Sequence, residues 1–148
     1  MGIMYLAVQV SPERGYMDDV ILIKPNQRSA NTAQTPGMIR QAGVAPEVCS
    51  SKGIWVGFVS TPPGTISGPH HHGDAETGIY VLRGQVRMYF GSMLEQTLLA
   101  DPGDFFYVPP NAIHMEENVS MTEPGELIVA RNSTNFMVVN VPDPRASS

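Results

Sequence analysis

The sequence predicts a single domain of the all-β class. Gly and Pro are abundant, with 14 and 13 of 148 residues, and only 16% of the residues are charged, a balance typical of many short strands joined by turns. Apolar and polar residues alternate in 85–90, where Val86 and Met88 share one face while Arg87 and Tyr89 share the other. From residue 53 onward, turn clusters interrupt the chain about every ten residues, the spacing of a sandwich or barrel.

The same alternation and the turn clusters between segments locate the expected strands. The segment 29–45 is polar and Ala-rich, and it could be an irregular arm or carry a short helix. No segment shows a sustained helical period. The expected strands are 4–10, 19–24, 53–59, 78–83, 85–90, 94–100, 105–108, 126–131 and 136–141.

These strands divide the chain into three parts. Residues 1–45 form an N-terminal arm containing strands, residues 46–141 a barrel, and residues 142–148 a tail that we expect to fray. Two isolated strands cannot form a domain of their own. We therefore expect the arm to pack on the edge of its own barrel or on that of a partner subunit.

Composition limits the partners that the protein can have. The formal net charge is −5 and the basic residues are scattered, so we expect neither nucleic acid nor a membrane surface as a partner. Cys49 is the single cysteine, which excludes an internal disulfide and a zinc cluster built from thiolates. The first residues lack the features of a secretion signal, and no apolar run reaches the roughly 18 residues of a membrane helix. We expect a cytoplasmic protein.

Three of the four histidines are consecutive, at 70–72, and the fourth is His114. On an extended strand, His70 and His72 project to one side while His71 turns to the other. With Glu76 four residues further on, these imidazoles suit Fe, Mn, Ni, Co or Zn better than Mg or Ca. The alternative is that the histidines belong to a solvated loop.

Two segments carry a resemblance to a known family. In 64–84, a glycine is followed by the histidines, by Glu76 and by a closing glycine, and this order resembles the first cupin motif. The segment 103–118 is similar to the second cupin motif, with His114 at its histidine position and Asn111 where the motif usually has glycine. Asparagine fits there because it also accepts left-handed turn geometry.

The resemblance implies a cupin double-stranded β-helix, or jelly-roll barrel, enclosing a metal near its mouth. Thr77 stands where the family's glutamate normally stands, one residue after Glu76. Strand alternation turns Thr77 inward and Glu76 outward unless a bulge at Gly78 restores Glu76 to the interior. Without that bulge, the site is a triad of histidines. The metal ligands that the resemblance implies are His70, His72, Glu76 and His114.

A metal held by three or four side chains keeps coordination positions for a substrate. We therefore expect a metal-dependent enzyme acting on a small organic molecule, with non-haem dioxygenase-type oxidation favoured. The cofactor expected is one divalent transition metal per chain; Fe is favoured, and Zn, Ni, Mn or Co would also fit. Two alternatives stay open: a non-redox isomerase, cyclase or lyase, and a non-catalytic barrel that binds a small ligand. Because small cupins of this kind are commonly dimers, we expect a homodimer.

Two strand arginines allow two interpretations. Arg87 and Arg131 could each bind a substrate carboxylate through the two arms of the guanidinium group. An arginine that points outward from its strand into solvent is the simpler interpretation of both.

Overall fold

The computed structural model describes residues 19–134 and 138–147 and confirms the all-β jelly-roll fold. The strand predicted at 4–10 lies outside the described residues. The helical elements are short: η1 (Pro25–Gln27), α1 (Pro46–Cys49) and η2 (Pro144–Ser147). The strands are β1 (Ile39–Val44), β2 (Trp55–Thr61), β3 (His70–His71), β4 (Thr77–Arg83), β5 (Val86–Phe90), β6 (Gln96–Ala100), β7 (Phe105–Val108), β8 (His114–Asn118), β9 (Gly125–Arg131) and β10 (Val139–Asn140).

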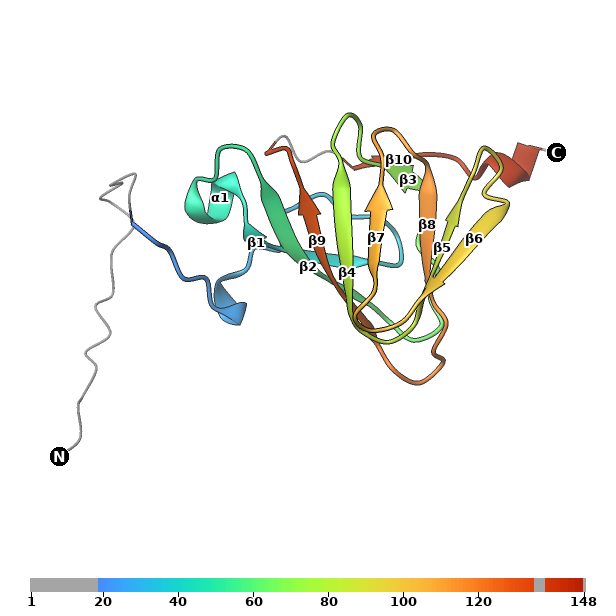
Figure 1. Ribbon diagram of the computed structural model, residues 1–148, viewed down its shortest axis with the longest axis horizontal. Helices are drawn as coiled ribbons and strands as arrows, with labels where there is room; N and C mark the ends of the chain where they lie inside the picture. Colours follow the sequence, from blue (N-terminus) through green and yellow to red (C-terminus); the bar gives the residue numbers. More distant parts are fainter. Residues whose placement is uncertain (1–18, 135–137, 148) are drawn as a thin grey trace.

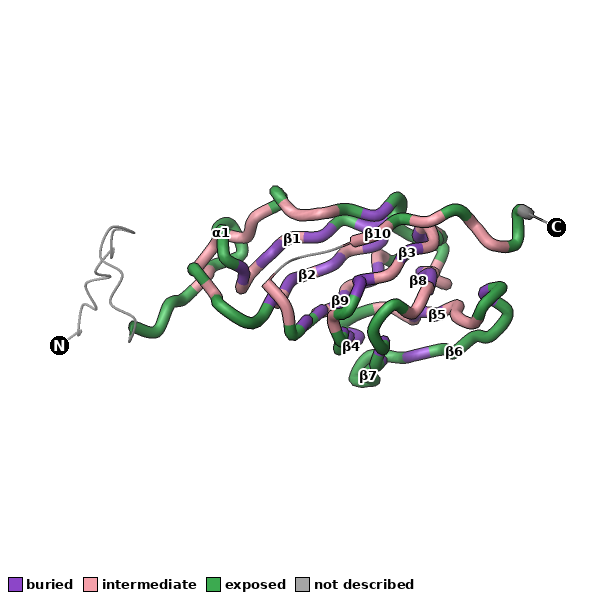
Figure 2. The backbone as a smooth tube through the Cα atoms, turned by 90° about the horizontal axis from the view of Figure 1, so that it is seen from above, coloured by how far each residue is buried: buried purple, intermediate pink, exposed green. Residues whose placement is uncertain are grey.

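The strands form two antiparallel sheets of five strands each, in the orders β1-β2-β9-β4-β7 and β10-β3-β8-β5-β6 (Figure 1). Strands distant in the chain are neighbours, as where β9 lies between β2 and β4. Buried and exposed residues alternate along most strands (Figure 2), because one face of each sheet points into the barrel. Trp55, Ile79, Val81 and Leu127 are almost completely buried in the core between the sheets.

Most expected strands form within two residues of their predicted bounds, but the N-terminal segment differs. The strand predicted at 19–24 is absent: these residues form no ladder, and Val20 is 100% exposed. A strand forms instead at Ile39–Val44, where the sequence indicated an irregular arm or a helix, and it pairs with β2 at the edge of the sheet. The sequence of this strand does not alternate between apolar and polar residues, because a charged residue, Arg40, occupies a buried position.

Two further segments differ in smaller ways from the expected pattern. Of the strand predicted at 136–141, residues 139–140 form β10 against β3, while 135–137 lie outside the described residues. In the tail, Pro144–Ser147 form a 3-10 turn in which Arg145 pairs with Asp143 at 2.7 Å. No helix within the described ranges is long and apolar enough to cross a membrane.

The turn before β8 determines where the fourth histidine enters the barrel. Asn111 has a φ of +60°, the left-handed conformation for which the motif usually has glycine. Its backbone N–H donates to the carbonyl of Gly73, which ties this turn to the loop after β3. The turn therefore brings the start of β8 alongside β3, where His114 pairs with His70.

Candidate metal centre

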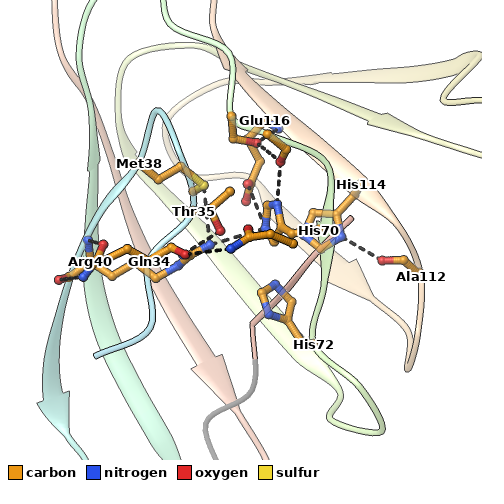
Figure 3. Close-up of polar contacts among 12 residues, drawn as sticks. Gln34, Thr35, Met38, Arg40, His70, His72, Ala112, His114 and Glu116 are labelled. Carbon is orange, nitrogen blue, oxygen red and sulfur yellow. Dashed lines mark hydrogen bonds and ion pairs between the residues drawn. The ribbon is translucent and has the colours of Figure 1, made fainter. Parts of the chain in front are cut away.

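The structure brings three of the expected ligands together inside the barrel (Figure 3). His70 on β3 and His114 on β8 are direct partners across the sheet, and His72 follows β3 on the same side as His70. The three rings lie with centroids 4.4 to 5.1 Å apart, and one nitrogen of each lies within 4.8 Å of the others. All three side chains are buried, with exposures of 5% or less.

Backbone carbonyls determine which nitrogen two of the three rings present to the cluster. Nδ1 of His70 donates to the carbonyl of Gly68, and Nδ1 of His114 donates to that of Ala112, both at 2.8 Å. The proton of each neutral ring is therefore on Nδ1, and the lone pair is on Nε2. Nε2 of His114 is buried and has no hydrogen-bond partner among the described residues. An orphaned lone pair of this kind is what a metal ligand requires.

Burial keeps these imidazoles neutral. Desolvation lowers the pKa of His70 to about 2, with smaller contributions from His114 and from the neighbouring arginines. The pKa of His72 and that of His114 are also lowered, in both cases mainly by burial. Neutral imidazole is the form that ligates a metal, so protons compete weakly for this site at neutral pH.

Glu76, the fourth expected ligand, lies outside the cluster. Its carboxylate is exposed and accepts hydrogen bonds from the hydroxyl of Tyr107 at 2.8 Å and from Nδ2 of Asn132 at 3.0 Å. Pairing of β4 with both neighbours is regular from Thr77 to Tyr80, so no bulge at Gly78 turns Glu76 inward. Thr77 takes the interior position instead, and its buried hydroxyl has no partner among the described residues.

The buried carboxylate near the cluster belongs to Glu116. From the sequence, one of Glu116, Glu117 and Asn118 could hydrogen-bond a ligand imidazole, or these residues could form a solvated turn after His114. Glu116 lies two residues after His114 on β8 and therefore points to the same face. Its Oε2 is 3.6 Å from Nε2 of His70 and has no hydrogen-bond partner within the described part of the chain. The structure places Glu116 beside a ligand imidazole, the first of these two alternatives.

Two buried guanidinium groups also face the cluster. Nη2 of Arg40 lies 3.3 Å from Nε2 of His70, and Nη2 of Arg131 lies 3.2 Å from Nε2 of His72. Burial, with Arg40 nearby, lowers the pKa of Arg131 to about 9, so Arg131 remains charged at neutral pH. Burial also lowers the pKa of Arg40, but a guanidinium group stays protonated in proteins. The outward interpretation is wrong for Arg131. It fits Arg87, which is partly exposed and pairs with Glu117.

A cavity of about 510 Å3 reaches the cluster at His114. Apolar side chains of β5, β6 and β7 line it, and the loop before β8 completes its wall. A small organic molecule could therefore occupy this space with one end close to the histidines. The lining residues include Met88, Phe90, Leu98, Phe106 and Val108.

The donor set fits a divalent transition metal. Three buried, neutral imidazoles with defined tautomers are ligands that suit Fe, Mn, Co, Ni, Cu and Zn. The carbonyls of Gly68 and Ala112 orient two of the rings in the way that outer hydrogen bonds orient ligating histidines in metalloproteins. The fold and the site thus define a β-barrel protein with an interior three-histidine metal site.

Comparison with known proteins identifies the family. The sequence profile of the cupin domain matches residues 57–131, and the chain belongs to the cupin family. That segment contains the three clustered histidines together with Glu116 and Arg131, whereas Arg40 lies before it. No protein among the curated sequences matches the chain.

Solved structures show the same fold. An oxalate oxidase aligns with a TM-score of 0.69 and 24% identity, over 89% of this chain and 69% of that one. The oxalate decarboxylase of Bacillus subtilis, studied for its Mn(II) centres, aligns with a TM-score of 0.64 and 23% identity, over 74% of this chain and 29% of that one. Peruvianin-I, a cysteine peptidase from Thevetia peruviana latex, aligns with a TM-score of 0.68 and 18% identity, over 86% of this chain and 83% of that one.

Proposed function

We propose that this protein is a metal-dependent cupin enzyme that oxidises a small organic substrate in the manner of a non-haem dioxygenase. The observation that carries the proposal is the position of the three-histidine cluster, since His114 forms part of the wall of the apolar cavity. Three ligands leave coordination positions for a substrate. The cavity supplies an apolar surface against which that substrate can pack.

The residues of the site have distinct roles in this proposal. Nε2 of His70, His72 and His114 would hold the metal, and the carbonyls of Gly68 and Ala112 keep two of these rings in orientation. When bound there, a divalent transition metal supplies a redox centre or a Lewis acid. The apolar side chains of the cavity exclude water from the reacting end of the substrate.

The comparisons support part of this proposal. Oxalate oxidase and oxalate decarboxylase are named for reactions of a small carboxylic acid, and one of these is an oxidation. We favour Fe as the metal, and the Mn(II) centres of the decarboxylase make Mn a second candidate. Because a protein described as a cysteine peptidase has the same fold, the barrel alone does not define a reaction. The proposal therefore rests on the residues of the site.

Oxygen consumption tests the proposal. Protein stripped with a chelator is reloaded without oxygen with Fe(II), Mn(II) or Zn(II) and then given 18O2 with chelating phenols, enols or thiols. We expect the Fe(II) protein, and not the Zn(II) protein, to consume oxygen and to incorporate both labelled atoms into the product. His71→Ala is the matched control, because His71 lies beside two of the ligands but outside the cluster. Turnover that is equal with Zn(II) and consumes no oxygen would contradict oxidation and identify a non-redox reaction.

A further inference from the structure

Two arginines occupy buried positions beside the histidines. Arg40 comes from β1, at one edge of the first sheet, and Arg131 from the end of β9, and they are only 1% and 4% exposed. They are the only buried Arg or Lys side chains among the described residues. Figure 3 shows the guanidinium group of Arg40 extending from β1 to the ring of His70.

Both arginines are held firmly by contacts that do not involve the histidines. Nη1 of Arg40 donates to Oγ1 of Thr35 at 2.8 Å, and its Nη2 contacts Sδ of Met38 at 3.6 Å. The guanidinium of Arg131 stacks over the ring of Trp55, 5.0 Å from the ring centroid. Neither group therefore has to become ordered when a ligand arrives, which favours tight binding.

The acceptors that these arginines use at the cluster are the nitrogens that would hold the metal. Nη2 of Arg40 donates to Nε2 of His70, and Nη2 of Arg131 donates to Nε2 of His72. A nitrogen whose lone pair is given to a metal cannot accept a hydrogen bond through that lone pair. In the metal-loaded protein, each of these two N–H groups needs a different acceptor at the same place.

The charges of the site also favour an anionic ligand. The only buried carboxylate among the described residues is that of Glu116, which lies 3.6 Å from Nε2 of His70, whereas two guanidinium groups are buried beside the histidines. A divalent cation would add two further positive charges. Excess charge in a buried site is costly unless a counter-ion enters with it. An anionic ligand would supply that charge and would also accept the two hydrogen bonds.

We infer that Arg40 and Arg131 form an anion-binding pair for the substrate, and that the substrate is a small carboxylate bound between the arginines and the metal site. The inference rests on the proposed function and specifies its substrate class. A guanidinium group matches a carboxylate because its parallel N–H groups can bind both oxygens. A phosphate could use the same N–H groups, and the experiment separates the two ligands.

Calorimetry with simple probes tests the inference without any turnover. Protein loaded with Mn(II) without oxygen is titrated with glycolate, with its neutral amide glycolamide and with inorganic phosphate, and metal content is measured on the same samples. We expect glycolate to bind at least about tenfold more tightly than glycolamide, because hydrogen bonds to a charged partner are stronger. Phosphate should bind more weakly than glycolate.

Substitutions assign the preference to the two arginines. Arg40→Gln and Arg131→Gln should each weaken glycolate binding by about tenfold or more while leaving glycolamide binding unchanged. Arg83→Gln is the matched control, since Arg83 is exposed and pairs with Glu123 and Glu126 away from the cluster; it should bind glycolate as the wild type does. The metal content of both site variants should equal that of the wild type.

Each other result has a definite meaning. If the wild type takes up no metal, the proposed function falls and the inference falls with it. If it takes up metal but binds glycolate no better than glycolamide, or phosphate more tightly than glycolate, the carboxylate assignment alone is overturned. If folded arginine variants lose the metal, the arginines support the metal rather than an anion, which also overturns the inference. The comparison of probes on the wild type tests the carboxylate class by itself, and the two arginine variants test whether the guanidinium groups bind it.

Discussion

His70 and His114 are 44 positions apart in the chain and lie directly opposite each other across β3 and β8, with ring centroids 4.4 Å apart. β3 pairs with β8 through this one pair of residues. The position of β8 is determined further by its regular pairing with β5, from Phe90 and His114 to Val86 and Asn118. The metal site is thus a consequence of strand register, and a change in register would separate its ligands.

Glu76, the expected fourth ligand, and Glu116, the buried carboxylate beside His70, should behave differently when substituted. Glu76→Gln should leave the metal content unchanged within about twofold, because its carboxylate bonds to Tyr107 and Asn132 outside the cluster. Glu116→Gln keeps the side chain's shape but removes the buried negative charge beside His70, so metal affinity should fall about 10- to 100-fold. Competition with a fluorescent chelator measures both affinities. A larger loss in Glu76→Gln than in Glu116→Gln would reverse the assignment.

The buried histidines should make the metal-free protein less stable in acid. Each folded-state pKa lies below the value of about 6.5 for an unfolded chain, so the unfolded state binds more protons. The stability that neutral histidines contribute is complete above about pH 6.5 and falls as the pH drops toward the folded pKa values. Between about pH 7.5 and 5.5, the loss should be about 1.4 kcal/mol for each of His70 and His72, whose folded-state pKa values lie far below this range.

Urea unfolding of chelator-treated protein at several pH values measures this loss. His72→Gln removes one of these groups and should reduce the loss by about 1.4 kcal/mol. His71→Ala, at a histidine outside the cluster, serves as the comparison. A free energy of unfolding that stays constant over this range would contradict the burial of three neutral imidazoles.

The stacking of Trp55 beneath Arg131 depends on a glycine. A Cβ on Gly57 would collide with the ring of Trp55 and would lie 2.8 Å from the carbonyl oxygen of Gln41. Gly57→Ala should therefore lower the free energy of unfolding by about 1–3 kcal/mol, the usual cost of overpacking. Gly53→Ala is the control, because a Cβ there has no neighbour within 4 Å. Equal stability of the two variants in urea would show that the ring adjusts freely.

We propose that the protein is a homodimer, in which the exposed apolar segment of the N-terminal arm packs on the second copy. Val20, Ile21 and Leu22 are 100%, 58% and 71% exposed in the single chain, and burial would remove this apolar surface from water. Sedimentation should give twice the 16.1 kDa of one chain, and Val20→Asp with Leu22→Asp should give monomers. A wild-type monomer at micromolar concentration would contradict this prediction.

The sequence was sufficient to predict the barrel and the histidine cluster because both depend on local patterns. The alternation of apolar and polar residues located the strands on either side of each turn. The two motifs in the sequence identified His70, His72 and His114. The outward position of Glu76 was one of two outcomes that strand alternation allowed. The regular pairing of β4 decided between them.

The sequence names Arg131 and Glu116 as possible site residues, but it could not decide their burial or reveal Arg40, because burial depends on contacts distant in sequence. Arg40 belongs to β1, which is a strand only through its pairing with β2, and its charge makes the segment look solvent-exposed. Arg131 and Glu116 occupy inward positions in their strands, where an apolar residue is usual. Each is tolerated there because the others and the histidines provide partners, which a linear pattern does not reveal.

Elemental analysis of freshly purified, untagged protein handled without oxygen tests the central claim most directly. We predict about one divalent transition metal per chain in the wild type and in His71→Ala, and less than about a tenth of that in His114→Ala, which loses one of three ligands. A wild-type protein that holds no metal, even after reconstitution with Fe(II), Mn(II) and Zn(II), would contradict the account of the site and leave only the barrel.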